Sequence, residues 1–355
     1  MKTMRRRGML AALALAAVAQ WSAPAAAEIR WQFFGGLPTT HAYAQQIMIG
    51  LERVKERSGG ELQIQYSYYG ETPYKQIEAL GLVRDGLVQM TEWLPANSVS
   101  TYPILAAPEL PFVAPAKGSA ADLQGAINRA WDTPAMTEAL NAIVAEHGAR
   151  VLARYYSQPM NFWAAKPLAK AEDFKGLKVR IFTPETAEFL EQLGAQPMNV
   201  TQPEVYTSLQ TNVLDGVVTG SGNVIGSKWN AILHARYIVN MMPGGPRMLL
   251  AQAALAELPP ELQAILLEEM AAVGAGLQAY MPESDKNSQA TMAAAGMTVT
   301  QASDADYARY REIAQTEVWP GWKARVGEQA DAVMQQIEDA LKEDRIQSGP
   351  RRRRR

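Results

Sequence analysis

The run at 178–185 combines the residue types that bind a carboxylate. Its first residues have a strand pattern, and Arg180 lies near the carboxyl end of that strand. Thr183 is a good helix N-cap, Pro184 suits the first helical position, and Glu185 falls in the first turn. A helix start offers unpaired N–H groups, and arginine adds a planar fork that matches a carboxylate. The spacing fits equally well an arginine that pairs with an internal Asp or Glu.

A glycine-rich run at 220–226 is the main indication of enzymatic chemistry. It follows an apolar strand and precedes a helical stretch, as a dinucleotide phosphate loop does. That fingerprint needs an acidic residue about 20 residues later, at the end of the next strand. No Asp or Glu occurs between Asp215 and Glu257. An NAD-type oxidoreductase that uses Gly220–Gly226 is therefore a disfavoured alternative.

Other catalytic chemistry has less support. The chain contains no cysteine, which excludes disulfides and thiolate chemistry. His41, His147 and His234 are not at metal-ligand spacing to one another, and Ser221 does not stand in a Gly-x-Ser-x-Gly motif. We therefore expect a protein that is not an enzyme and that has neither a metal site nor a cofactor.

The elements expected around these residues alternate between strands and helices. Strand patterns occur at 29–34, 62–68, 87–90, 151–156, 178–182, 213–219, 237–242 and 248–253. Helical patterns occur at 43–57, 75–84, 119–147, 183–193, 204–210 and 260–295, and again in the C-terminal region to about residue 342. Residues 95–115 are rich in proline and predict an ordered loop. The β-α-β-α-β order at the start implies an α/β fold with a largely parallel sheet covered by helices.

Three sequence blocks resemble the solute-binding proteins of TRAP transporters, the C4-dicarboxylate-binding type. The blocks are Asp-Phe-Lys-Gly-Leu-Lys-Val-Arg at 173–180, Leu-Gly-Ala-Gln-Pro at 193–197, and Glu-Val-Tyr-Thr-Ser-Leu-Gln at 204–210 followed by Asp215-Gly216. The resemblance extends from Glu28 to the C-terminal helical region. It implies a two-domain periplasmic binding protein fold, with the ligand cleft between the domains and a long connecting helix.

The resemblance also implies which residues contact the ligand. In this family the arginine that ends the Gly-Leu-Lys-x-Arg block pairs with the ligand carboxylate, and here it is Arg180. Many members carry a second arginine upstream, where this chain has Met160, and the acidic residue that supports a bridging cation in keto-acid binders is missing. The expected ligand contacts are Arg180, Gln158, Asn161, Thr183, Thr219, Trp93, Asn97 and Tyr69. For Trp93 and Asn97, ordinary packing is an equal alternative.

The class of acid stays open between a dicarboxylate, a keto acid, an aromatic acid and a sugar acid. One arginine, Met160 and nearby aromatic residues also fit a monocarboxylate with an apolar body. The implied function is the binding component of a TRAP transporter, which captures a small organic acid and delivers it to the membrane permease. A periplasmic module that senses a ligand is the alternative.

Residues 1–27 have the pattern of a secretory signal peptide. Four basic residues precede an apolar run too short to span a bilayer, and Ala25, Ala26 and Ala27 suit a signal peptidase. Removing this leader changes the net charge from −2 to −6, and the body without the five terminal arginines carries −11. An acidic body argues against nucleic acid as a partner. We expect a periplasmic monomer.

The resemblance and the strand pattern together predict a domain division. The first domain is expected at 28–157 plus 246–285, and the second at 158–245 plus 286–345. Residues 346–355 form a basic tail, which we interpret as a frayed terminus.

Overall fold

The computed structural model describes residues 28–114, 118–241 and 244–347, with only the backbone described for 343–347. The predicted signal peptide at 1–27 lies outside these residues, as does the basic tail from residue 348 onwards. Among the described residues, no helix is long and apolar enough to cross a membrane.

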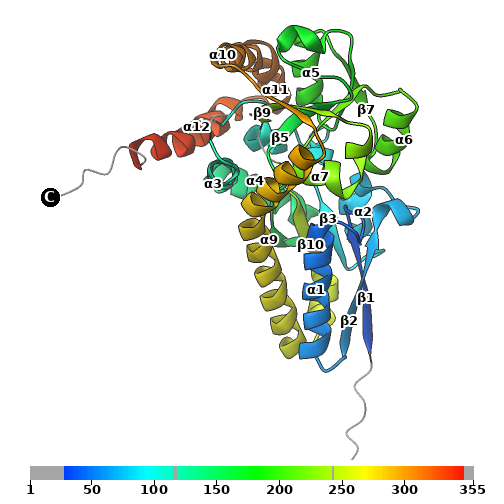
Figure 1. The fold of residues 1–355 in the computed structure, drawn as a ribbon. Helices are drawn as coiled ribbons and strands as arrows, with labels where there is room; N and C mark the ends of the chain where they lie inside the picture. The colour runs from blue at the N-terminus through cyan, green and yellow to red at the C-terminus, as the bar shows by residue number, and fades with distance from the viewer. Residues whose placement is uncertain (1–27, 115–117, 242–243, 348–355) are drawn as a thin grey trace, which may run out of the picture.

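The first sheet has the strand order β2-β1-β3-β10-β4. Figure 1 labels β1, β2, β3 and β10 in the half of the molecule that also holds α1. Its strands are β1 (Ile29–Gly35), β2 (Leu62–Tyr68), β3 (Met90–Trp93), β4 (Ala149–Arg154) and β10 (Arg247–Ala251). β1 runs parallel to β2 and β3, whereas β10 lies between β3 and β4 and runs antiparallel to both. The prediction of a largely parallel sheet is confirmed for the three strands from which it was drawn, β1, β2 and β3. The antiparallel β10, which returns to this sheet from the second one, was not expected.

The second sheet has the strand order β11-β9-β5-β8-β6-β7. Its strands are β5 (Met160–Ala164), β6 (Lys178–Ile181), β7 (Gln196–Asn199), β8 (Gly216–Thr219), β9 (Ala235–Met241) and β11 (Thr298–Gln301). The sequence patterns did not predict β5, β7 and β11. All five residues of β5 are buried, so it lacks the alternation that marks a half-buried strand.

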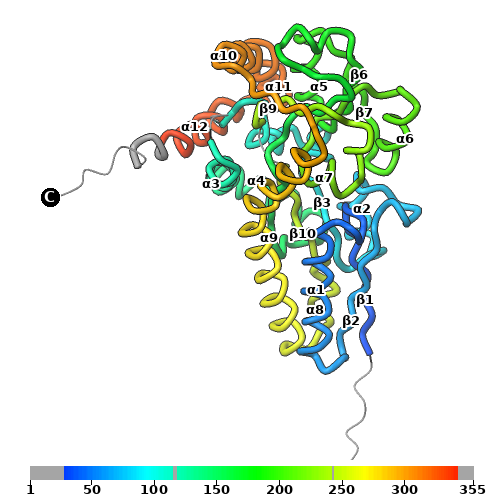
Figure 2. Tube along the Cα trace, viewed as in Figure 1, coloured from blue at the N-terminus to red at the C-terminus, as the bar shows by residue number. Residues whose placement is uncertain are grey.

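The chain passes between the two sheets at three places. One crossing segment joins β4 to β5, a second joins β9 to β10, and the third connection is the long helix α9 (Pro260–Ala294). The first two lie side by side, because Ser157 N–H donates to the Gly244 carbonyl at 3.0 Å and Tyr155 N–H donates to the Pro246 carbonyl at 3.3 Å. Figure 2 shows α9 running past α1 and on towards α7 in the other half of the molecule.

Helices cover both sheets. The remaining α-helices are α1 (Ala42–Arg57), α2 (Ala79–Arg84), α3 (Ala120–Trp131), α4 (Pro134–Glu146), α5 (Pro184–Gln192), α6 (Val205–Gln210), α7 (Ser221–Gly226), α8 (Gln252–Glu257), α10 (Asp304–Ile313), α11 (Trp319–Val326) and α12 (Ala330–Gln347). The predicted loop at 95–115 contains two 3₁₀ helices, η3 (Pro95–Ser98) and η4 (Pro103–Glu109), and a π-helical turn, η8 (Ala314–Val318), follows α10. α12 packs on α3 and α4, although the predicted division assigns it to the second domain; the boundaries stay a prediction.

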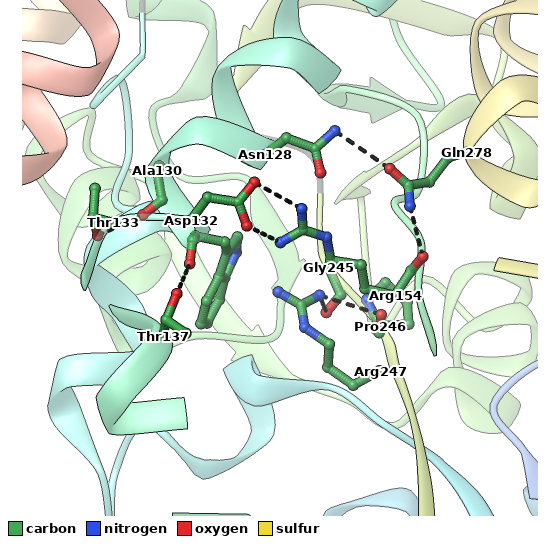
Figure 3. Close-up of polar contacts among 11 residues, drawn as sticks. Asn128, Ala130, Asp132, Thr133, Thr137, Arg154, Gly245, Pro246, Arg247 and Gln278 are labelled. Carbon is green, nitrogen blue, oxygen red and sulfur yellow. Dashed lines mark hydrogen bonds and ion pairs between the residues drawn. The ribbon is translucent and has the colours of Figure 1, made fainter. Parts of the chain in front are cut away.

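Two arginines anchor the end of the second crossing segment (Figure 3). Arg247 on β10 lies opposite Arg154 on the neighbouring strand β4. The Arg247 guanidinium lies 4.5 Å from the ring centroid of Trp131 and donates to the Gly245 carbonyl at 2.6 Å. Arg154 forms a two-pronged ion pair with Asp132, at 2.5 and 2.8 Å. These contacts fix the crossing segment to the end of α3.

The Asp215-Gly216 motif is explained by packing. The Asp215 carboxylate accepts the Lys178 backbone N–H at 2.9 Å, which ties the start of β6 to β8. A Cβ on Gly216 would lie 2.4 Å from the Trp163 backbone oxygen, so only glycine fits beside β5. The motif therefore sets the register of the strand that carries Arg180.

Candidate functional site

A cavity of about 660 Å³ lies where elements of both sheets meet. The loops after β1 and β3 form one wall, and the ends of β6 and β8 with the loop after β7 form the other. The two crossing segments also line it, through residues such as Ser157 and Gly244. Loops at the carboxyl ends of strands are the usual ligand sites of α/β sheets, so this cavity is the candidate site.

Arg180 is a buried cation on the wall of this cavity. Its side chain is 8% exposed, its Nε donates to the Val200 carbonyl at 3.0 Å, and its guanidinium lies 5.6 Å from the Phe182 ring centroid. No acidic residue pairs with it among the described residues, and burial lowers the pKa of Arg180 to about 10. The nearby acid Glu185 pairs instead with Arg325, at 2.7 Å. The guanidinium is therefore held by one edge and keeps its other nitrogens for an anion.

The helix start beside Arg180 forms as the sequence predicts. Thr183 is the N-cap of α5, and its Oγ1 accepts the Thr186 N–H at 3.2 Å. Pro184 occupies the first helical position. Thr183 and Pro184 both line the cavity, so the positive end of α5 adjoins the guanidinium.

Gln158 and Thr219 also line the cavity, and both are tied to neighbouring elements. The Gln158 Nε2 donates to Ser284 Oγ on α9 at 2.7 Å, and the Thr219 Oγ1 accepts from Asn223 Nδ2 on α7 at 3.0 Å. The oxygen of the Gln158 amide and the hydroxyl hydrogen of Thr219 are the groups left for a ligand.

On the opposite wall, Tyr69 and Asn97 line the cavity. The Tyr69 hydroxyl shares a 2.5 Å hydrogen bond with Thr91 Oγ1, so the ring is fixed in place. Asn97 lies on η3 and is half-buried, and its side-chain amide has no hydrogen-bond partner among the described residues. Asn97 is thus the more adaptable of the two contacts.

The structure does not bring Trp93 and Asn161 to the cavity wall. Trp93 is fully buried in the core, where its Nε1 donates to Ser98 Oγ at 3.0 Å. The Asn161 Oδ1 accepts the backbone N–H groups of Val239 and Asn240, at 2.8 and 2.9 Å, and its Nδ2 donates to the Pro159 carbonyl. The polar groups of both residues form hydrogen bonds within the protein. For Trp93, this supports the alternative interpretation that the residue packs in the core.

The glycine-rich run at 220–226 forms α7, and its glycines accommodate other side chains of this chain. A Cβ on Gly222 would lie 2.6 Å from Gln158 Nε2, and one on Gly226 would lie 2.2 Å from His41 Cδ2. The Ser221 hydroxyl is fully buried and donates to Asp285 on α9 at 2.7 Å. These contacts fill the space that a phosphate loop would keep for its ligand.

The ionisable cavity residues that the sequence analysis missed include His41, Glu92 and Glu109. Burial raises the pKa of Glu109 to about 7, an effect that Arg247 opposes, and its Oε1 accepts the Gly245 N–H at 3.1 Å. Burial also raises the pKa of Glu92. A charged residue inside the strand Met-Thr-Glu-Trp at 90–93 was the available signal, because an unpaired buried carboxylate is rare outside functional sites.

His41 makes the protein less stable in acid. It is the N-cap of α1, its Nδ1 accepts the Tyr43 N–H at 3.2 Å, and burial lowers its pKa from 6.5 to about 4. Below pH 6.5, His41 is therefore protonated in the unfolded chain, whereas in the folded chain it stays neutral down to about pH 4. We expect a loss on the order of 3 kcal/mol of stability across that window.

His41→Asn keeps a capping side chain and removes the titration. Urea unfolding at a series of pH values should show a smaller acid loss in the variant than in the wild type. Parallel curves for the two proteins would contradict the assignment.

Comparisons with known proteins agree with this architecture. The model of the family "Bacterial extracellular solute-binding protein, family 7" (DctP) matches residues 39–323. A Salmonella typhimurium protein, YiiZ, described as uncharacterised, is 29% identical over 248 residues, which cover 69% of this chain and 72% of the relative.

Solved structures share the fold. A marine metagenome TRAP solute binding protein specific for pyroglutamate is 23% identical, with a TM-score of 0.78 over 89% of this chain and 99% of that chain. The sugar acid binding protein DctPAm from Advenella mimigardefordensis, in complex with galactonate, is 17% identical, with a TM-score of 0.79 over 89% of this chain and 99% of that chain. The predicted two-domain binding-protein fold with a long connecting helix is confirmed. Because the family model spans most of its length, the chain belongs to family 7 of the bacterial extracellular solute-binding proteins.

Proposed function

We propose that this protein is the periplasmic receptor of a TRAP transporter, which captures a small organic acid and delivers it to the membrane permease. The observation that carries this proposal is Arg180, a buried cation that lines the cavity and has no acidic partner among the described residues. A buried charge without a partner is costly, and a ligand carboxylate would remove that cost. The family, the leader pattern at 1–27 and the carboxylate ligands of the solved structures support the proposal.

In this mechanism Arg180 binds the ligand carboxylate, and Thr183 and the start of α5 lie beside the bound carboxylate. Gln158 and Thr219 orient the rest of the ligand from the same side. Tyr69 and Asn97 contact it from the other wall, so a ligand that touches both walls favours a closed cleft. The ligand shifts the balance between open and closed forms only by its preference for the closed one. We propose binding without chemical conversion, so the bound acid should be recovered unchanged.

A thermal-shift screen of the mature protein tests the function. The panel contains dicarboxylates, keto acids, hydroxy acids, aromatic acids and sugar acids, with NAD as a control. A ligand at 100 times its dissociation constant stabilises the protein by about 2.7 kcal/mol, which raises the melting temperature by roughly several degrees. A shift with one class of acid is expected. A flat response to all acids, or a shift with NAD alone, would contradict the proposal.

A further inference from the structure

A second uncompensated charge, of opposite sign, lies on the other wall of the same cavity. Glu92 stands on β3 in the first sheet, lines the cavity and is 1% exposed. Its Oε2 accepts the Gly36 N–H at 2.5 Å, and its Oε1 accepts the Tyr155 hydroxyl. Both partners are donors, a pattern that suits an ionised carboxylate.

No cation from the described part of the chain pairs with this carboxylate. Among the described residues Glu92 forms no ion pair, and the groups that act on it besides burial are Tyr155 and Gly36. A buried carboxylate normally has a counter-cation, because water is not available to stabilise the charge. Each of its oxygens keeps a lone pair that a further donor could use.

A second carboxylate of the cavity wall, the partly buried Glu109, is different. Glu109 has the positive charge of Arg247 acting on it and accepts the Gly245 N–H at the crossing segment. The negative charge of Glu109 is therefore compensated by Arg247 within the protein. Among the described residues, Glu92 is the one of these two carboxylates that lacks a positive partner, just as Arg180 lacks a negative one.

The cavity thus presents a cation on β6 and an anion on β3, and neither is paired with an opposite charge in the described ranges. We propose that the preferred ligand is a zwitterion, whose carboxylate binds Arg180 and whose protonated nitrogen, an ammonium or amidinium, binds Glu92. This inference rests on the proposed function and narrows its substrate class. One such ligand neutralises both buried charges and bridges the two walls. A dicarboxylate would satisfy Arg180 but place a second negative charge towards the buried Glu92, and these like charges would repel each other.

Matched pairs of acids test the inference by calorimetry on the mature protein. The pairs are L-proline with cyclopentanecarboxylate, pipecolate with cyclohexanecarboxylate, and 4-aminobutyrate with pentanoate. In each pair the carboxylate and the skeleton are similar, and only the first acid carries a protonated nitrogen. We expect at least one zwitterion to bind on the order of tenfold or more tightly than its partner.

Glu92→Gln removes the charge and keeps the shape of the side chain. It should cancel the preference for the zwitterion over its nitrogen-free partner, because it weakens binding of the zwitterion. The nitrogen-free acid should bind as before or better through Arg180. This retained binding shows that the variant is folded. Glu109→Gln is the comparison, and it should leave the preference between the paired acids in place.

The outcomes separate the two proposals. If acids bind but the nitrogen-free partner binds as tightly as the zwitterion in every pair, the zwitterion inference is overturned and the proposed function stands. The same holds if Glu109→Gln, and not Glu92→Gln, cancels the preference. If neither these pairs nor the wider panel of acids bind, the proposed function fails and this inference fails with it.

Discussion

Replacing Arg180 with methionine should weaken binding of the carboxylate ligand by roughly 2–5 kcal/mol, or about 30- to 5,000-fold. The guanidinium is held through Nε by the Val200 carbonyl, which presents its remaining donors to the cavity. Methionine fills much of the same volume but carries no donor. Arg180→Lys should bind with intermediate affinity, because lysine keeps the charge and loses the two-pronged fork.

The unliganded Arg180→Met protein should be no less stable than the wild type. The substitution removes one hydrogen bond, worth about 1 kcal/mol, and also removes a buried charge without a partner. Calorimetry gives the affinity, and thermal unfolding without ligand gives the stability. Arg309→Lys is the control, because Arg309 pairs with Glu172 on the surface at 2.7 Å. Unchanged affinity in Arg180→Met would remove Arg180 from the site.

Replacing Trp93 with alanine should lower the free energy of unfolding by roughly 3–5 kcal/mol. The indole is fully buried, and its Nε1 donates to Ser98 Oγ. Alanine would leave a cavity and an unsatisfied hydroxyl beside η3. Trp93→Phe is the milder change, with an expected loss of about 1–2 kcal/mol, because phenylalanine fills most of the space but cannot donate the hydrogen bond.

The pattern of effects distinguishes packing from ligand contact. Trp93→Phe should lower the urea midpoint and leave ligand affinity unchanged. Asn97→Ala should show the opposite pattern, because the Asn97 amide lines the cavity and has no partner among the described residues. A large loss of affinity in Trp93→Phe at unchanged stability would place the indole against the ligand.

The helix start beside Arg180 could be predicted from the sequence because its signals are local, whereas the role of Arg180 stays a prediction that the family resemblance implies. A strand that ends near Arg180, followed by Thr183 and Pro184, specifies an N-capped helix within a few residues, and α5 begins as expected. Only this part of the cavity wall follows from local geometry, since the arginine and the helix start lie at the end of one strand while the opposite wall comes from the first sheet.

Tertiary context decided what the sequence could not. Asn161 stands on β5, a strand buried on both faces, and its amide pairs with the backbone of β9 far along the chain. Nothing within a few residues of Asn161 specifies that contact. Glu92 was missed for the related reason that its lack of a counter-cation is a property of the surrounding elements, and these come together only in the folded chain.

The position of β10 has a consequence for the order in which the chain can fold. Met90 on β3 pairs with Leu250 on β10, and β4 pairs with the other edge of the same strand. During synthesis or export, residues 29–154 therefore emerge long before the strand that joins β3 to β4. Until then, both strands present open edges to other chains, and the pairing that closes them spans a long loop. Such distant contacts slow folding, so this half of the molecule should depend on protection from association until residue 251 has emerged.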